Sequence, residues 1–235
     1  MDVIFDAVGP SSAGAGGADP TSPVTWSHTC TGSNLVLFVG ISVGDRNGNQ
    51  FTVTGVTYNG VALTNITSKG SGPDSTYGYA TLWYLVNPAT GANTVSVSFT
   101  RSNPEIRDAI ECGSVSFSGV DQTTPYQNTA TAAGAGPPLS APTVNVTSAT
   151  GNIVLDVVAN GSGITSSGQT NRWLKNVNTN TAGGNGAQST AAGAGSVTMS
   201  YVTTNDWWGI IGVDVKAAAA GLDFTHTGAI SATGT

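Results

Sequence analysis

Carboxylates are the first residues of this chain that could take part in chemistry, and they are sparse. Only 9% of its 235 residues are charged, whereas a globular domain usually carries about 25%. Glycoside hydrolysis would need two carboxyl groups about 5–9 Å apart. The only glutamates are Glu105 and Glu111, while Asp156 and Asp214 occupy matching places in two predicted strands. We interpret these groups as edge or outward-facing carboxylates, and predict no enzyme, no catalytic residue and no cofactor.

One short segment has the spacing of a cation-binding loop. Asp45, Asn47 and Asn49 offer oxygen ligands at positions 1, 3 and 5, as calcium loops do. The glycine and the bidentate glutamate that complete such a loop are missing. The segment is therefore interpreted as a polar connection between strands, and its three residues are kept as a weak candidate metal site.

The histidine and cysteine residues offer little more. His28 and Cys30 place two soft ligands on one face of a predicted strand, but structural zinc needs four. Together with Cys112, Cys30 leaves two alternatives open. They are two small buried thiols, or one disulfide that closes a long loop.

The adjacent residues Trp207 and Trp208 are the possible ligand contacts. Neighbouring residues of a strand point to opposite faces, so one ring is expected in the core and the other at the surface. Rings at the surface of carbohydrate-binding modules stack on sugars. Large strand residues are mostly core, however, so a carbohydrate-binding or adhesin module that contacts host glycans is the alternative function.

Strand patterns must position all of these residues. The run 34–41 is almost continuously apolar, which predicts a strand covered on both faces. Segment 94–99 alternates, with Val95, Val97 and Phe99 facing inward. Asn59-Gly60 lies between two apolar segments and predicts a tight hairpin. With no convincing helical pattern, the sequence predicts an all-β, antiparallel, jelly-roll-like sandwich.

The second half of the chain repeats the strand pattern of the first. Residues 152–155 correspond to 34–37, 197–201 to 95–99, and 210–215 to 110–115, in the same order. This favours one sandwich built from two related halves, with similarity by chance as the alternative. Three stretches rich in Gly, Ala, Ser and Pro, residues 9–23, 130–142 and 181–195, are interpreted as surface loops.

These patterns suggest a body with two flanking segments. We assign residues 1–23 to an N-terminal arm and first strand, 24–216 to the sandwich domain, and 217–235 to a C-terminal extension. The net charge is −6 and the basic residues form no cluster, which argues against nucleic-acid binding. No apolar stretch is long enough to span a bilayer, and the first residues do not resemble a secretory signal.

Several segments resemble a family of uncharacterised bacterial and tailed-phage β-sandwich proteins, some encoded among virion structural genes. The resemblance covers roughly residues 20–216 and is carried by segments 53–64, 82–88, 115–125, 168–173 and 197–199. Its most specific block is Phe-Ser-Gly-Val-Asp-Gln, at 117–122. The resemblance implies a jelly-roll-like sandwich without known catalysis, and it supplies no site residue.

The expected function is therefore a non-enzymatic virion protein, either a capsid decoration or a minor tail or fibre component. Its partners would be other capsid or tail proteins, and symmetric particles favour several copies, so a homo-oligomer is expected. Attachment would use sheet edges, loops or either terminal segment. The expected location is a virion assembled in the host cytoplasm, with an extracellular location as the alternative.

Overall fold

The computed structural model describes residues 1–45, 51–72, 78–102, 108–134, 141–177, 184–204 and 206–219. These residues form eighteen strands in antiparallel sheets, which confirms the all-β sandwich. None of them lies in a helix, so the described part contains no helix that could cross a membrane.

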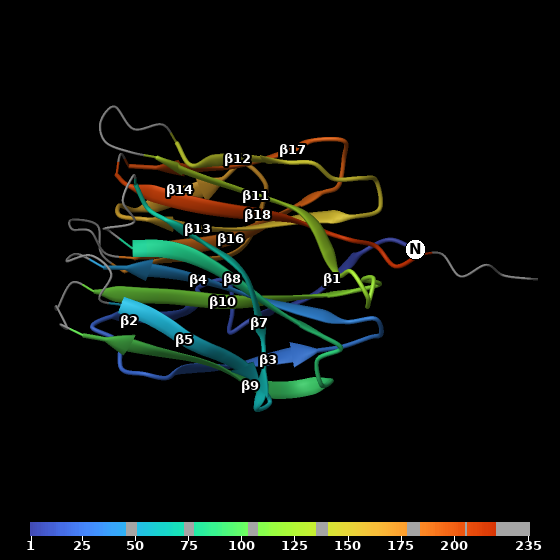
Figure 1. Cartoon of the computed structure of the whole chain (residues 1–235), viewed down its shortest axis with the longest axis horizontal. Helices are drawn as coiled ribbons and strands as arrows, with labels where there is room; N and C mark the ends of the chain where they lie inside the picture. Colours follow the sequence, from blue (N-terminus) through green and yellow to red (C-terminus); the bar gives the residue numbers. More distant parts are fainter. Residues whose placement is uncertain are drawn as a thin grey trace, which may run out of the picture.

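The strands form four stacked sheets (Figure 1), two from each half of the chain. Outer sheet 1 has the order β3 (Val24–Cys30), β9 (Gly91–Arg101), β5 (Phe51–Tyr58), β6 (Val61–Ala62). Inner sheet 1 has the order β1 (Ile4–Gly9), β10 (Ala109–Ser118), β4 (Val36–Gly44), β8 (Gly78–Val86), β7 (Thr64–Gly70), and β2 (Ala15–Ala18) also pairs with β10.

The second half supplies the other two layers. Inner sheet 2 has the order β11 (Tyr126–Gly134), β18 (Trp208–Val215), β13 (Ile153–Asn160), β16 (Asn185–Ala192), β15 (Thr170–Asn176). Outer sheet 2 has the order β12 (Thr143–Val146), β17 (Val197–Thr203), β14 (Ile164–Ser167). The two inner sheets pack against each other, so each half forms its own two-sheet sandwich and the halves stack back to back. The prediction of one sandwich shared by the two halves is therefore wrong in this respect, because each half supplies enough strands for both of its sheets.

Each half has jelly-roll connectivity. In the first half, β1-β10-β4-β8 faces β3-β9-β5-β6, the strand order of two nested Greek keys. In the second, β11-β18-β13-β16 faces β12-β17-β14. Thus β4 corresponds to β13, β9 to β17 and β10 to β18, the three correspondences read from the sequence. Strands β7 and β15 also match, because each adds to the same edge of its inner sheet.

Three apolar cores hold the layers together. The first core lies between outer and inner sheet 1, the middle core between the inner sheets, and the second core between inner and outer sheet 2. All nine residues of β4 are buried, because this strand faces two cores. The doubly covered strand predicted from its apolar run is therefore confirmed. Asn59 and Gly60 have φ of 50° and 77°, as the predicted hairpin requires.

All three stretches interpreted as surface loops contain strand residues, since residues 130–134 also belong to β11. Residues 185–192 form β16, inside inner sheet 2, and residues 15–18 form β2. The small residues of β16 serve close packing between layers. A Cβ on Gly186 would lie 2.6 Å from the Cβ of Ser42 in inner sheet 1.

Both terminal segments contact the body. Strand β1 pairs with β10 along its length, and the backbone N–H of Val3 donates to the carbonyl of Gly151 at 2.8 Å. After β18, the Lys216 ammonium lies 2.9 Å from the Asp121 carboxylate, and Ala217 forms a bridge with Val120. Residues 220–235 of the proposed extension lie outside the described residues.

Candidate functional site

His28 lies inside the first half and is fully satisfied. Ser116 Oγ donates to Asp6 Oδ2 at 2.7 Å, so it accepts from His28 Nε2–H at 2.9 Å. His28 Nδ1 then accepts from Ser114 Oγ at 2.8 Å, and Ser114 itself accepts from the indole of Trp26. Burial lowers the pKa of His28 to about 4, against the opposing charge of Asp6. These hydrogen bonds hold a neutral imidazole in place, and the two serines that contact it, Ser114 and Ser116, are both fully buried.

The two cysteines are buried, unbridged thiols that face the first core. Cys30 lies on β3 and Cys112 on β10, and burial raises the pKa of both thiols. Among the described residues, no three potential ligands group around a possible metal site. Of the two alternatives for the cysteines, the buried thiols are confirmed.

The interpretation of Asp156 and Asp214 as outward-facing carboxylates is wrong. Both are fully buried between the sheets of the second half. Asp156 accepts hydrogen bonds from Ser189 N at 2.7 Å, Tyr201 OH at 2.7 Å and Gln169 Nε2 at 3.2 Å. Burial raises its pKa to about 7, although these hydrogen bonds favour the charged form.

Asp214 lies in a second polar cluster of the same kind. It accepts from Ser148 Oγ at 2.6 Å, from Asn152 Nδ2 at 3.0 Å and from Gln127 Nε2 at 3.0 Å. These donors come from segments far apart in the sequence. The cluster ties the start of β11 and the loop before β13 to β18, which is a structural role.

Among the described residues, Glu111 is the one interior carboxyl group without such support. It is fully buried on β10, and neither of its oxygens has a hydrogen-bond partner among the described residues. Burial raises its pKa well above the ordinary value, and Lys175 acts in the opposite direction. The other glutamate, Glu105, lies outside the described residues. The glutamates therefore provide no described carboxylate pair.

The candidate calcium loop is described at only one of its three positions. Asp45 is buried, and its Oδ2 accepts from the backbone N–H of Phe51 at 3.1 Å. Asn47 and Asn49 lie outside the described residues. The described contact of Asp45 is a link from the end of β4 to the start of β5.

Of the two adjacent tryptophans, one lies in the core, as the sequence suggested, and the other is half-buried. Trp208 belongs to the second core, and its indole lies over Gly134. Trp207 precedes β18 and is half-buried, with its ring against Gly72. A Cβ on Gly72 would lie 2.4 Å from that ring. Trp207 therefore packs on the chain between β7 and β8, and its role as a ligand contact stays a prediction.

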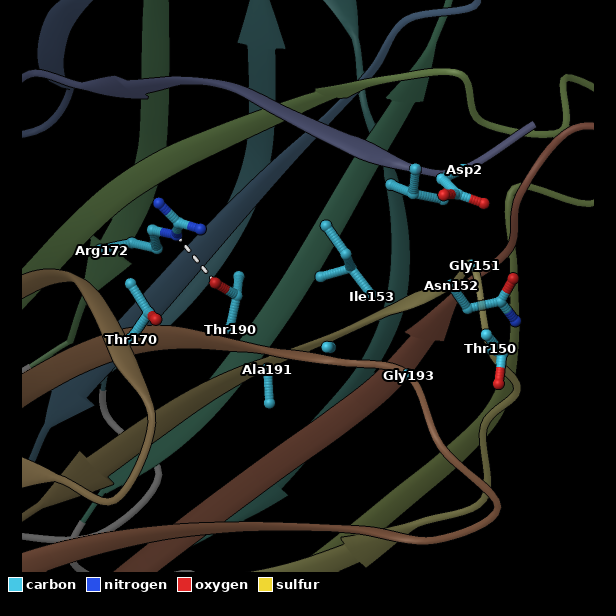
Figure 2. A pocket seen from close by; sticks show the side chains of 12 residues that line it. Asp2, Thr150, Gly151, Asn152, Ile153, Thr170, Arg172, Thr190, Ala191 and Gly193 are labelled. Atoms are coloured by element: carbon cyan, nitrogen blue, oxygen red, sulfur yellow. Dashed lines mark hydrogen bonds between the residues drawn. The ribbon is translucent and has the colours of Figure 1, made fainter.

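A cavity of about 360 Å³ opens where the two halves meet, and we call it the seam cavity (Figure 2). Arg172, Thr170 and Thr190 lie at one end and Asp2 at the other, with Ile153 between them. The cavity thus combines a cation, hydroxyl groups, an apolar patch and a carboxylate. No pattern in the sequence predicted it, because its residues come from four separate segments.

A second cavity of about 540 Å³ opens at the edge of the first half, between β5 and the β7–β8 pair; we call it the edge groove. Its lining combines aromatic rings with hydroxyl and amide groups: Phe51, Thr52, Val53, Asn65, Ser68, Gly70, Tyr79, Thr81 and Trp83. Tyr79 OH accepts from Val53 N at 2.9 Å, which fixes that ring. The indole nitrogen of Trp83 is buried without a hydrogen-bond partner among the described residues. Indole N–H groups usually have a partner when buried.

Comparisons of this chain with protein-family models, with curated proteins and with solved structures find no match. The fold alone therefore defines the class: this is an all-β protein of two stacked jelly-roll sandwiches.

Proposed function

We propose that this protein is a non-enzymatic structural component of a tailed-phage particle, as a capsid decoration or a minor tail or fibre protein. Jelly rolls occur in many viral capsid domains, and the sequence resemblance implies the same setting. Unrelated functions share this fold, so the proposal depends on a feature of the surface.

That feature is the outer edge of β11. It is the longest edge strand among the described residues, with nine residues and no charged side chain. By contrast, the edge strands β7 and β15 carry Lys69, Arg172 and Lys175. Exposed edges attract other strands, and charged residues commonly block this pairing. A bulge between Gln127 and Ala130 leaves the following residues, up to Gly134, as the regular part of the edge.

An edge of this kind supplies contact area without chemistry. A capsid or tail protein, or a second copy of this chain, would add a strand alongside β11 and take up its unpaired backbone groups. The interior carboxylates and His28 serve the fold itself, which agrees with a structural role. The location that follows is the virion.

The test is whether the protein is present on particles and whether the β11 edge holds it there. Particles are banded on a density gradient from a lysate of the host strain and analysed by mass spectrometry. Purified protein is then sedimented with the same particles. Thr131→Lys places a charge on the exposed edge and should abolish co-sedimentation, whereas Thr64→Lys, on the edge strand β7, should not.

Absence from the particles would reject the proposal, and normal co-sedimentation of Thr131→Lys would reject the role of β11. A chain that ends at residue 219 tests separately whether the rest of the C-terminal extension is needed for co-sedimentation. It retains the hydrogen bond from Ala218 N to Gly119 O at 2.8 Å.

Carbohydrate binding is the second candidate function, and the edge groove favours it. The exposed part of the ring of Trp83 or Tyr79 could contact the C–H face of a sugar, while the hydroxyl and amide groups of the groove bind its hydroxyl groups. The groove also has the mixed apolar and polar lining typical of small-molecule sites.

A glycan array with two matched variants tests this function. Trp83→Phe keeps an aromatic ring but reduces the area available for stacking, and it should weaken binding. Trp207→Phe makes the same change outside the groove. Loss of binding only in Trp207→Phe would transfer the site to Trp207, and an array without any binding would remove this candidate.

A further inference from the structure

A bulge in β15 determines where Arg172 points. The register of β15 against β16 shifts between Asn171 and Trp173, so Arg172 is the extra residue. In a regular strand, Arg172 and Trp173 would point to opposite faces. Here Trp173 enters the middle core, and the Arg172 guanidinium lies 3.7 Å from the ring centroid of Phe5 on β1. The bulge therefore directs both side chains toward inner sheet 1.

The guanidinium of Arg172 has unused hydrogen-bonding capacity. Its Nε–H donates to Thr190 Oγ1 at 2.8 Å, the only hydrogen bond that Arg172 makes within the described residues. No carboxylate among those residues forms an ion pair with it, whereas Arg101 and Lys216 are both paired. Arg172 is half-buried, so part of its hydration is lost, and the contacts with Phe5 and Thr190 leave its two terminal nitrogens without an acceptor among the described residues. An anion accepting from these two nitrogens would replace the lost hydration.

The other residues of the seam cavity indicate which chemical groups the ligand would have besides its negative charge. Thr170 and Thr190 place hydroxyl groups near the cation, and Val3 and Ile153 supply an apolar surface. Asp2 lies at the far end (Figure 2), where it would repel a second negative charge and accept from a hydroxyl group. The ligand would therefore have one negative end, a C–H surface and hydroxyl groups.

We propose that the seam cavity binds a sugar acid, with its carboxylate on Arg172 and its hydroxyl groups toward the threonines and Asp2. A planar carboxylate matches the guanidinium fork in a bidentate pair. The volume of about 360 Å³ lies within the range of roughly 300–1,000 Å³ usual for small-molecule sites. This site is independent of the particle role and of the edge groove.

Titration of the full chain with three probes, followed by NMR, tests the ligand class. Galacturonate should bind, and galactose, which lacks only the carboxylate, should bind at least tenfold more weakly. Inorganic phosphate should also bind at least tenfold more weakly, because it lacks the hydroxylated ring. Failure of galacturonate to bind, or equal binding of either other probe, would overturn the proposal.

Variants of the chain test the position of the site. Arg172→Gln should lower galacturonate affinity at least tenfold, and Arg172→Lys, which keeps a cation but loses the fork, should also weaken it. Ala192→Phe, on an exposed residue that lines the cavity, should block binding while Arg172 stays intact. Lys69→Gln removes a charge elsewhere and should bind as the wild type does. Thermal melting confirms that each variant is folded, and wild-type affinity in folded Arg172→Gln and Ala192→Phe would exclude this cavity.

Discussion

Acidification should destabilise this protein through His28, and the size of the effect follows from its buried site. The pKa of His28 is lowered from 6.5 to about 4, mainly because burial penalises the charged imidazolium. Between these two values the unfolded chain binds the proton and the folded chain does not. The stability contributed by the neutral imidazole is therefore complete above pH 6.5 and is lost as the pH falls toward 4. At about 1.4 kcal/mol per pH unit, the full loss is about 3 kcal/mol.

The assay compares how stability depends on pH in the wild type and in His28→Gln. Urea unfolding at pH 7, 6, 5 and 4 gives the free energy of unfolding of each protein. The glutamine amide does not titrate, so between pH 6.5 and 4 the variant should lose about 3 kcal/mol less than the wild type. Only the change with pH is compared, so an initial destabilisation of the variant by the lost bonds to Ser114 and Ser116 does not affect the result.

A matched control and an independent measurement complete the test. His226→Gln removes the chain's only other histidine and should leave the pH dependence from His28 in place. NMR titration of the His28 ring should give a pKa near 4 in the folded protein. A value near 6.5, or identical pH dependence in wild type and His28→Gln, would refute the reasoning.

Three further predictions concern the interior. Because the pKa of Asp156 is raised to about 7, its contribution to stability should be complete below pH 3.8 and fall as the pH rises to 7; Asp156→Asn should remove this dependence in urea unfolding. Gly113→Ala would bring a methyl group within 2.3 Å of the Trp173 ring and should lower stability by about 1–3 kcal/mol in thermal melts, whereas Gly55→Ala, with open space around it, should not. The two buried cysteines should stay unmodified by a thiol reagent under native conditions and react fully in denaturant, and rapid native labelling would contradict their burial.

Regular strand patterns made much of the fold predictable. Alternation in β9 correctly placed Val95, Val97 and Phe99 in the first core, because a strand covered on one side needs apolar residues at every second position. The apolar run of β4 correctly indicated a strand covered on both faces. The order of similar segments in the two halves corresponds to equivalent strands of two jelly rolls.

The sites depend on contacts that no local pattern contains. Strand β16 was interpreted as a loop because its glycine and alanine residues resemble a flexible segment, although close packing of two layers requires them. Asp214 was expected to face outward, but residues 62, 66 and 87 positions away in the sequence donate to it. The direction of Arg172 depends on a bulge, for which its neighbours in the sequence give no signal.

The back-to-back packing of the inner sheets also limits how such a chain could have arisen. The middle core uses apolar side chains from β4, β8 and β10 on one side and from β13 and β18 on the other. One jelly roll alone would expose this whole face to water and would associate with a second copy through it. A single-sandwich ancestor of this protein would thus have been a face-to-face dimer, and joining its two copies in one chain would have turned a concentration-dependent assembly into a permanent one.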